Sequence, residues 1–178
     1  MTIRIILAGL FAALAWSPIH AQEFSADPDR IEERIQALGR FGENAEGGVS
    51  RLAFSDADLA GREYIKGLMQ QAGLQVRVDT AGNIIGRREG SESDLAPIMF
   101  GSHIDSVPGG GNYDGDVGVI GAIEVAQLLH ERGILTKHPI EIVSFTDEEG
   151  GLTGSRGMIG KLGEGTLGVM SHSGMTIR

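Results

Sequence analysis

Apolar residues recur at helical spacing in two early segments of the chain. Residues 28–41 predict a first helix, with apolar side chains on one face at Ile31, Ile35, Leu38 and Phe41. A second helix is predicted from about Ser55 to Ala72. Ser55 and Asp58 form a pattern that resembles a capping box at its start, and Gly73 stands where a helix commonly ends. Both helices are expected to serve as scaffold.

Alternating apolar and polar positions then predict strands. Residues 74–79 alternate as a half-buried strand does, and residues 83–88 return after a turn at 80–83, which indicates a hairpin. Residues 97–100 are continuously apolar, a pattern typical of a strand in the interior of a sheet. Residues 138–145 predict another central strand, with apolar side chains at Ile140, Ile142, Val143 and Phe145.

The segment from Val117 to Leu129 is apolar on nearly every side, so it predicts a buried helix that ends by Gly133. Helices and strands therefore share the chain, which predicts an α/β domain. The apolar strands that end near residues 100 and 145 are both followed by acidic residues. If these strands are parallel neighbours, their carboxyl ends lie in one crevice, where open α/β sheets place active sites.

Composition narrows the class of protein and of partner. The 178 residues are enough for one domain with a sizeable core, and 41% hydrophobic with 22% charged residues is typical of globular proteins. The net charge of −9 and the lack of an evident basic face make nucleic acid and membrane surfaces poor partners. We therefore expect no nucleic-acid binding and no stable membrane association. Cysteine is absent, so stability must come from the core or from metal.

Residues 1–21 have the pattern of a secretory signal peptide. Arg4 gives a positive start, residues 5–16 are uncharged and mostly apolar, and the segment ending at Ala21 resembles a cleavage region. The apolar run is too short to span a bilayer comfortably, and a signal anchor is the alternative. We expect cleavage near Ala21 and an exported, periplasmic protein, with residues 22–178 as its mature part.

Candidate chemistry gathers in the glycine-rich stretch from Gly101 to Gly121, which holds one histidine and three aspartates. His103 and Asp105 are two residues apart, so on extended backbone both side chains point to the same face. A carboxylate beside an imidazole can fix the tautomer that binds metal. Asp114 lies across the glycine loop, from where the backbone could bring it back beside His103.

Glu148 and Glu149 follow the last predicted strand. Because adjacent side chains cannot normally point at one atom, they suit a division of labour in which one binds metal and the other moves protons. Taken one at a time, these features also fit a hydrogen-bonded histidine, a solvated pair of loop charges, or a phosphate cradle. The loop lacks the lysine and hydroxyl residue of a P-loop. The residues alone leave metal-assisted hydrolysis and structural loops as open alternatives.

Three motifs stand in order along the chain. They are Gly-Ser-His-Ile-Asp-Ser-Val-Pro at 101–108, Gly-Gly-Asn-Tyr-Asp-Gly at 110–115 and Phe-Thr-Asp-Glu-Glu-Gly at 145–150. Together they resemble the M20 family of metallopeptidases and amidohydrolases. Further matches point to its hydantoinase/carbamoylase branch, at residues 47–52, 79–90 and 154–156. That branch includes N-carbamoyl-L-amino-acid hydrolases, ureidopropionases and allantoate amidohydrolases, and the resemblance covers residues 28–178.

The resemblance implies a fold and a site. The fold would be α/β, a three-layer αβα domain like that of zinc exopeptidases, with a mixed, mainly parallel sheet that is incomplete at the C-terminus. His103 would bind one metal ion, Asp114 would bridge two, and Glu149 would bind the second. Glu148 would be the general base that activates water. Asp105 would be the partner that orients the imidazole of His103. The cofactor would be two divalent ions, Zn²⁺ in the first place and Mn²⁺ or Co²⁺ otherwise.

The chain departs from the family in its length, because it ends at Arg178. Relatives supply two further ligands, typically histidines, and insert a dimerisation or lid domain. We therefore expect this chain to be the N-terminal part of a longer protein that forms homodimers. His172 leads toward the inserted part and is expected to be structural or at the surface, and neither His130 nor His138 is expected to be a ligand.

The function implied is metal-dependent hydrolysis of non-peptide C–N bonds in small N-carbamoyl or ureido molecules by a metal-activated water. An M20 aminopeptidase or dipeptidase is the second enzymatic alternative, which an exported location favours. An inactive truncated fragment is the third alternative, because His103, Asp114 and Glu149 alone would leave each metal ion short of a protein ligand.

Overall fold

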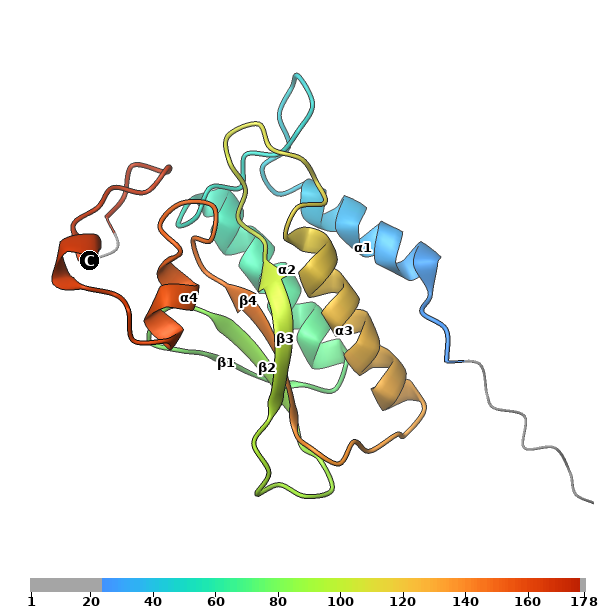
Figure 1. The fold of residues 1–178 in the computed structure, drawn as a ribbon. Helices are drawn as coiled ribbons and strands as arrows, with labels where there is room; N and C mark the ends of the chain where they lie inside the picture. Colours follow the sequence, from blue (N-terminus) through green and yellow to red (C-terminus); the bar gives the residue numbers. More distant parts are fainter. Residues whose placement is uncertain (1–23, 177–178) are drawn as a thin grey trace, which may run out of the picture.

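The computed structural model describes residues 24–176 (Figure 1). The predicted signal peptide, residues 1–21, lies outside them. Within the described range, no helix is long and apolar enough to cross a membrane. The helices are α1 Pro28–Gly39, α2 Asp56–Gln71, α3 Asp116–Glu131, α4 Thr153–Met158 and α5 Glu164–Leu167. The strands are β1 Gln75–Val78, β2 Ile84–Arg88, β3 Ile98–His103 and β4 Ile140–Phe145.

One of the two hydrogen bonds of a capping box is present at the start of α2, and the other is shifted by one residue. The Ser55 hydroxyl accepts a hydrogen bond from the main-chain N–H of Asp58 at 3.2 Å. The Asp58 carboxylate accepts one from the N–H of Phe54 at 2.9 Å. The first bond satisfies a main-chain N–H that a helix start leaves without a partner, and the second holds the residue before the N-cap. Gly73 follows the helix with a φ of +77°, the left-handed conformation that ends many helices.

The four strands form one mixed sheet in the order β1-β2-β4-β3. β1 and β2 form the predicted antiparallel hairpin, β2 is also antiparallel to β4, and β3 is parallel to β4. The expected α/β class and mixed sheet are confirmed. The expectation of a mainly parallel sheet does not hold for residues 24–176, because the short turn between β1 and β2 leaves no room for the crossover that a parallel pair needs.

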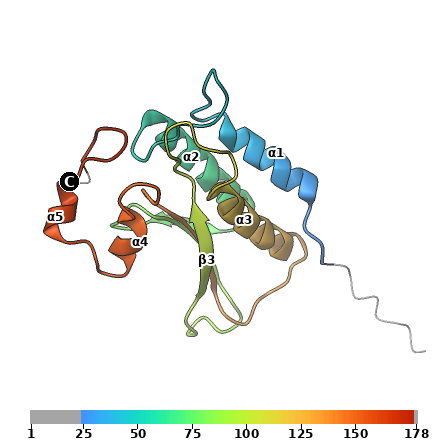
Figure 2. The same ribbon diagram turned by 45° about the horizontal axis from the view of Figure 1, so that its top comes forward.

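The parallel pair of β3 and β4 sets the position of the predicted site. The pairing runs from Ile98 opposite Ile140 to His103 opposite Phe145. β3 is longer than the apolar run that predicted it, because its polar end continues the ladder along β4. His103 is therefore the last residue of a strand. The loops that follow both strands leave the sheet at the same edge (Figure 2).

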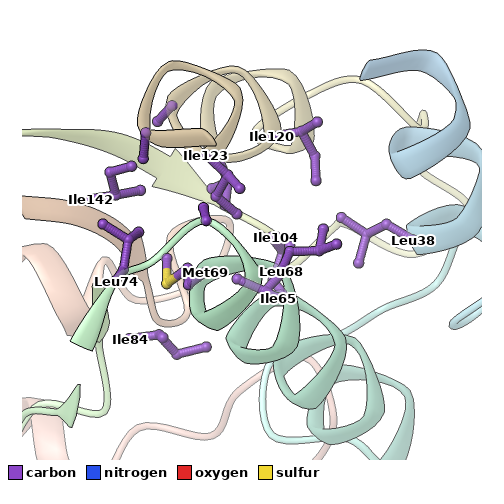
Figure 3. Close-up of a cluster of buried hydrophobic side chains, with 14 of the residues drawn as sticks. Leu38, Ile65, Leu68, Met69, Leu74, Ile84, Ile104, Ile120, Ile123 and Ile142 are labelled. Carbon is purple, nitrogen blue, oxygen red and sulfur yellow. The ribbon is translucent and has the colours of Figure 1, made fainter. Parts of the chain in front are cut away.

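One face of the sheet is covered by α2 and α3, and α1 packs against α3 (Figures 1 and 2). The core between these layers is made of aliphatic side chains, among them Ile65, Met69, Ile84, Ile123 and Ile142 (Figure 3). α3 buries apolar positions along its length, as predicted for residues 117–129. Both long helices that contact the sheet use this face, so the described residues form one of the two helical layers that we expected.

Gly101 allows β3 to approach β4 closely. Its φ is +153°, and a Cβ at this position would lie 1.9 Å from the carbonyl oxygen of Val143. Gly101→Ala should force the strands apart and lower the free energy of unfolding, measured with urea, by about 1–3 kcal/mol or more. Gly67→Ala in α2 is the control, since a Cβ there meets nothing within 4 Å. It should raise stability by about 0.5–1 kcal/mol. Wild-type stability of G101A would contradict the close strand pairing.

Burial raises the pKa of the Asp58 carboxyl from 3.8 to about 6, against the opposing hydrogen bond from Phe54. Between about pH 4 and about pH 6 the folded protein holds a proton on Asp58 that the unfolded chain does not. The stability of the protein therefore falls as the pH rises through this range. Asp58→Asn keeps an acceptor oxygen for Phe54 but does not titrate. The unfolding free energy of wild type relative to D58N should fall by roughly 1–3 kcal/mol between pH 4 and pH 7. Denaturation of both proteins across this range measures it, and parallel profiles would show that Asp58 does not titrate there.

Candidate metal centre

The ends of the two parallel strands bring together three of the predicted residues. His103 closes β3, Asp114 lies in the loop before α3, and Glu149 lies in the loop after β4. One possible ligand atom from each of them lies within 4.8 Å of those of the other two. His103 Nε2 and Asp114 Oδ1 are 3.9 Å apart, within reach of a cation bonded to both. The His103 side chain is 11% exposed and that of Asp114 is 80% exposed, so the cluster is open to solvent on one side.

The main chain of Asp105 orients the imidazole of His103. His103 Nδ1 lies 3.0 Å from the Asp105 carbonyl oxygen, and 3.7 Å from Oδ1 of the same residue. Nδ1–H donates to the carbonyl, which leaves the lone pair of Nε2 available on the side of Asp114. We expected the carboxylate of Asp105 to fix the tautomer, and this detail is wrong. The backbone turns after β3, so the carbonyl reaches the ring first.

The carboxylate of Asp105 instead joins the two loops of the site. It is buried, and it accepts hydrogen bonds from the main-chain N–H of Glu148 at 3.2 Å and of Glu149 at 3.0 Å. Burial raises the pKa of the Asp105 carboxyl above its ordinary value, while the two N–H donors oppose that rise. One residue thus orients His103 with its main chain and the acidic loop with its side chain.

Glu148 and Glu149 diverge, as their adjacency in the chain predicted. Glu149 contributes to the three-residue cluster, whereas Glu148 does not. Glu148 Oε2 accepts a hydrogen bond from the hydroxyl of Ser155 in α4 at 2.8 Å. The two carboxylates therefore occupy different surroundings, which is the arrangement that separate metal-binding and proton-transfer roles require.

Asp147 shapes the acidic turn, a role that sequence reasoning missed. It is buried and has a φ of +56°, a conformation that aspartate tolerates better than most residues. Its Oδ2 accepts hydrogen bonds from the N–H of Gly151 at 3.0 Å and from the hydroxyl of Thr153. The two consecutive glycines after Glu149 were the sequence signal for such a turn. Backbone held in this region at a candidate site is a common form of stored strain.

Asn83 links the β1–β2 turn to the acidic turn and gives the motif at residues 79–90 a physical role. The side chain is completely buried. Its amide nitrogen donates to Asp79 Oδ2 at 2.8 Å and to the carbonyl of Gly154 at 3.0 Å. Its amide oxygen accepts from the N–H of Thr146 at 3.1 Å. The backbone on either side of the two glutamates is thereby tied to the sheet.

A cavity of about 100 Å³ lies beside the acidic turn. It is lined by Asp147, Gly150, Gly151, Val169, Met170, Ser171 and His172. His172 lines this cavity and is outside the three-residue cluster. His130 packs against Gly73, and Nδ1 of His138 lies 2.9 Å from the carbonyl oxygen of Ala96.

Asp105→Asn replaces one acceptor oxygen by a nitrogen that cannot accept, so one N–H of Glu148 or Glu149 loses its partner. We expect the affinity for Zn²⁺, measured by calorimetric titration, to fall about 10- to 100-fold. Stability should fall by about 1–3 kcal/mol. The control is Asp27→Ala, which removes the N-cap of α1 and should lower stability by about 0.5–2 kcal/mol without weakening Zn²⁺ binding. Unchanged affinity in D105N would refute the role of the carboxylate.

Comparison with known proteins places the chain in a family. A model of peptidase family M28 matches residues 83–166. The N-carbamoyl-L-amino acid amidohydrolase of Geobacillus stearothermophilus is 42% identical over 154 residues, which cover 84% of this chain and 38% of that protein. The ureidoglycolate hydrolase of Oryza sativa subsp. japonica is 44% identical over 71% of this chain and 26% of its own length.

A solved structure gives the same result. The hydantoinase/carbamoylase family amidase from Burkholderia ambifaria matches with a TM-score of 0.80 and 37% identity, over 86% of this chain and 39% of its own. The chain spans 38% of the length of the Geobacillus stearothermophilus amidohydrolase, which is less than two fifths. The family model that matches is peptidase family M28, whereas we expected M20. The expected hydantoinase/carbamoylase branch is confirmed. The chain belongs to the hydantoinase/carbamoylase family of amidases.

Proposed function

We propose that this chain carries part of the catalytic centre of a metal-dependent amidohydrolase. The reaction would cleave non-peptide C–N bonds in N-carbamoyl or ureido compounds. The observation that carries the proposal is the convergence of His103, Asp114 and Glu149, with Glu148 beside them and bonded elsewhere. The names of the relatives, an N-carbamoyl-L-amino acid amidohydrolase and a ureidoglycolate hydrolase, support this substrate class.

The residues present fit a divalent cation. The Nδ1–H of His103 is engaged by a carbonyl, so Nε2 can bind metal, and two carboxylates supply negative charge. We assign two divalent ions to the whole protein, Zn²⁺ in the first place and Mn²⁺ or Co²⁺ otherwise. His103 would help to hold one ion, Glu149 the other, and Asp114 both. Such ions, when bound, polarise a carbonyl group and lower the pKa of a bound water.

The chain's own groups divide the remaining tasks. Glu148 is the group that we assign to proton transfer, because its carboxylate stands outside the cluster yet adjoins a cluster residue in the chain. The Ser155 hydroxyl holds Oε2 of Glu148, which leaves the other oxygen to accept a proton. Asp105 holds the peptide groups of both glutamates in place. The exposed Asp114 leaves the cluster accessible to a substrate.

A peptidase is the second candidate, because the family model that matches residues 83–166 is one of peptidases. The same groups can act on a peptide carbonyl, since metal-assisted hydrolysis requires a polarised carbonyl and an activated water in both cases. The leaving group and the substrate-binding residues decide between the two activities.

A substrate panel separates these candidates. The whole protein, loaded in turn with Zn²⁺, Mn²⁺ and Co²⁺, is assayed on N-carbamoyl amino acids, ureidoglycolate and allantoate, and separately on dipeptides. We expect release of ammonia from the first group and no release of amino acids from the second. Cleavage of dipeptides alone would replace the amidohydrolase by a peptidase. Absence of turnover in both groups would contradict both candidates.

The adjacent glutamates provide the sharpest test of the roles. Glu148→Gln should lower kcat by about 10²- to 10⁴-fold and leave Zn²⁺ affinity unchanged. Glu149→Gln should weaken Zn²⁺ binding by at least about tenfold. Glu46→Gln, at an exposed loop position, is the matched control and should change neither quantity. Weaker metal binding in E148Q with normal binding in E149Q would reverse the assignment.

A further inference from the structure

Arg51 is a buried cation next to the candidate metal centre. It lies in the segment between α1 and α2, and only 1% of it is exposed. The main chain of this residue is also engaged, because its N–H donates to the Ser106 hydroxyl at 2.9 Å and its carbonyl accepts from the Ser106 N–H at 3.0 Å. Two hydrogen bonds therefore hold the segment around Arg51 against Ser106, the residue after Asp105.

The guanidinium of Arg51 ties three elements together. Its Nε donates to the carbonyl of Ile104 at 2.6 Å, directly after β3. Its Nη1 donates to the carbonyls of Leu38 at 2.8 Å and Phe41 at 3.1 Å, at the end of α1. Its Nη2 donates to both carboxylate oxygens of Asp116, the first residue of α3, at 2.8 and 2.6 Å.

Two of these contacts adjoin predicted metal ligands. Ile104 is the residue after His103, so the bond to its carbonyl fixes the end of β3. Asp116 is two residues after Asp114, and its main-chain N–H donates to the Asp114 carbonyl at 2.7 Å. Arg51 therefore contacts, with one rigid group, both backbone segments whose side chains form the 3.9 Å pair of His103 and Asp114.

The chemistry of arginine suits this task. Its planar group offers five donors in a fixed geometry, whereas lysine offers a flexible point charge. A buried ion pair is weak support for stability, because apolar residues of similar size often replace such pairs without loss. Arg51 lies between two segments that carry candidate ligands. Its ion pair with Asp116 can therefore keep these segments at a fixed spacing.

We propose that Arg51 is a positioning residue that sets the spacing of His103 and Asp114, and thereby the affinity of the site for metal. This inference rests on the proposed function only in requiring that the cluster binds a divalent cation. The guanidinium of Arg51 hydrogen-bonds to Ile104, Asp116 and the end of α1 and to none of the candidate ligand side chains, so it acts through the segments that it connects.

The test is metal binding by the metal-free protein, measured by calorimetry with Zn²⁺ and by the visible absorption of bound Co²⁺. Arg51→Met should weaken Zn²⁺ binding about 10- to 100-fold. It should also alter the Co²⁺ spectrum, which reports ligand geometry and does not respond to a loss of stability alone. Arg51→Lys should restore only part of the affinity, since lysine cannot reach all of these acceptors at once.

Arg30→Met is the matched control. Arg30 pairs with Glu124 at 2.6 Å, and the Glu124 side chain is 1% exposed, as is that of Asp116. Glu124 lies eight residues further along α3, roughly 12 Å from Asp116. R30M should therefore lower stability but change Zn²⁺ affinity by no more than about twofold.

Circular dichroism shows whether each variant folds. If R51M does not fold, Asp116→Asn, which keeps the shape of the side chain, gives the result in its place and should show weaker Zn²⁺ binding with an altered Co²⁺ spectrum. Folded R51M or D116N with the affinity and spectrum of R30M would overturn the role of Arg51 and leave the proposed function intact. All of these measurements use the whole protein, and a whole wild-type protein that binds neither ion would overturn the proposed function and this inference together.

Discussion

The parallel register of β3 and β4 is the constraint on which the candidate site depends. Because His103 stands opposite Phe145, the two strands end together and their loops leave the sheet at one edge. Asp105 can then span the gap and accept hydrogen bonds from both glutamates of the second loop. A slip of one residue would turn His103 to the opposite face of the sheet and separate it from the acidic loop.

Buried polar side chains support a site that is itself partly exposed. Asp105, Asn83 and Arg51 are all buried and hydrogen-bonded to main-chain groups of neighbouring segments. Such groups are costly when unpaired in a low-dielectric interior and rigid when paired. The loops can therefore stay open to a substrate while the atoms behind them hold the candidate ligands in place. This arrangement of accessible groups on a rigid support is typical of functional sites.

Local patterns predicted much of the fold. The long helices, the β1–β2 hairpin and the last strand follow from periodicity and helix-end residues that act over a few positions, and the structure has them within a few residues of the predicted ends. The polar end of β3 was missed, because residues 101–103 are held in the strand by pairing with β4 and not by their own pattern. The antiparallel pairing of β2 with β4 was also missed, because it joins segments that are far apart in the chain.

The sequence by itself determined which chemistry is available. It singled out His103, Asp114, Glu148 and Glu149 as candidate reactive residues, and its motifs identified the family. Only the tertiary structure decided which atoms meet. In the folded protein the carbonyl of Asp105 orients His103, and Arg51 pairs with Asp116, which is 65 positions further along the chain. The reason is that a side chain's type is local, whereas its hydrogen-bond partner depends on backbone directions set by contacts between distant segments.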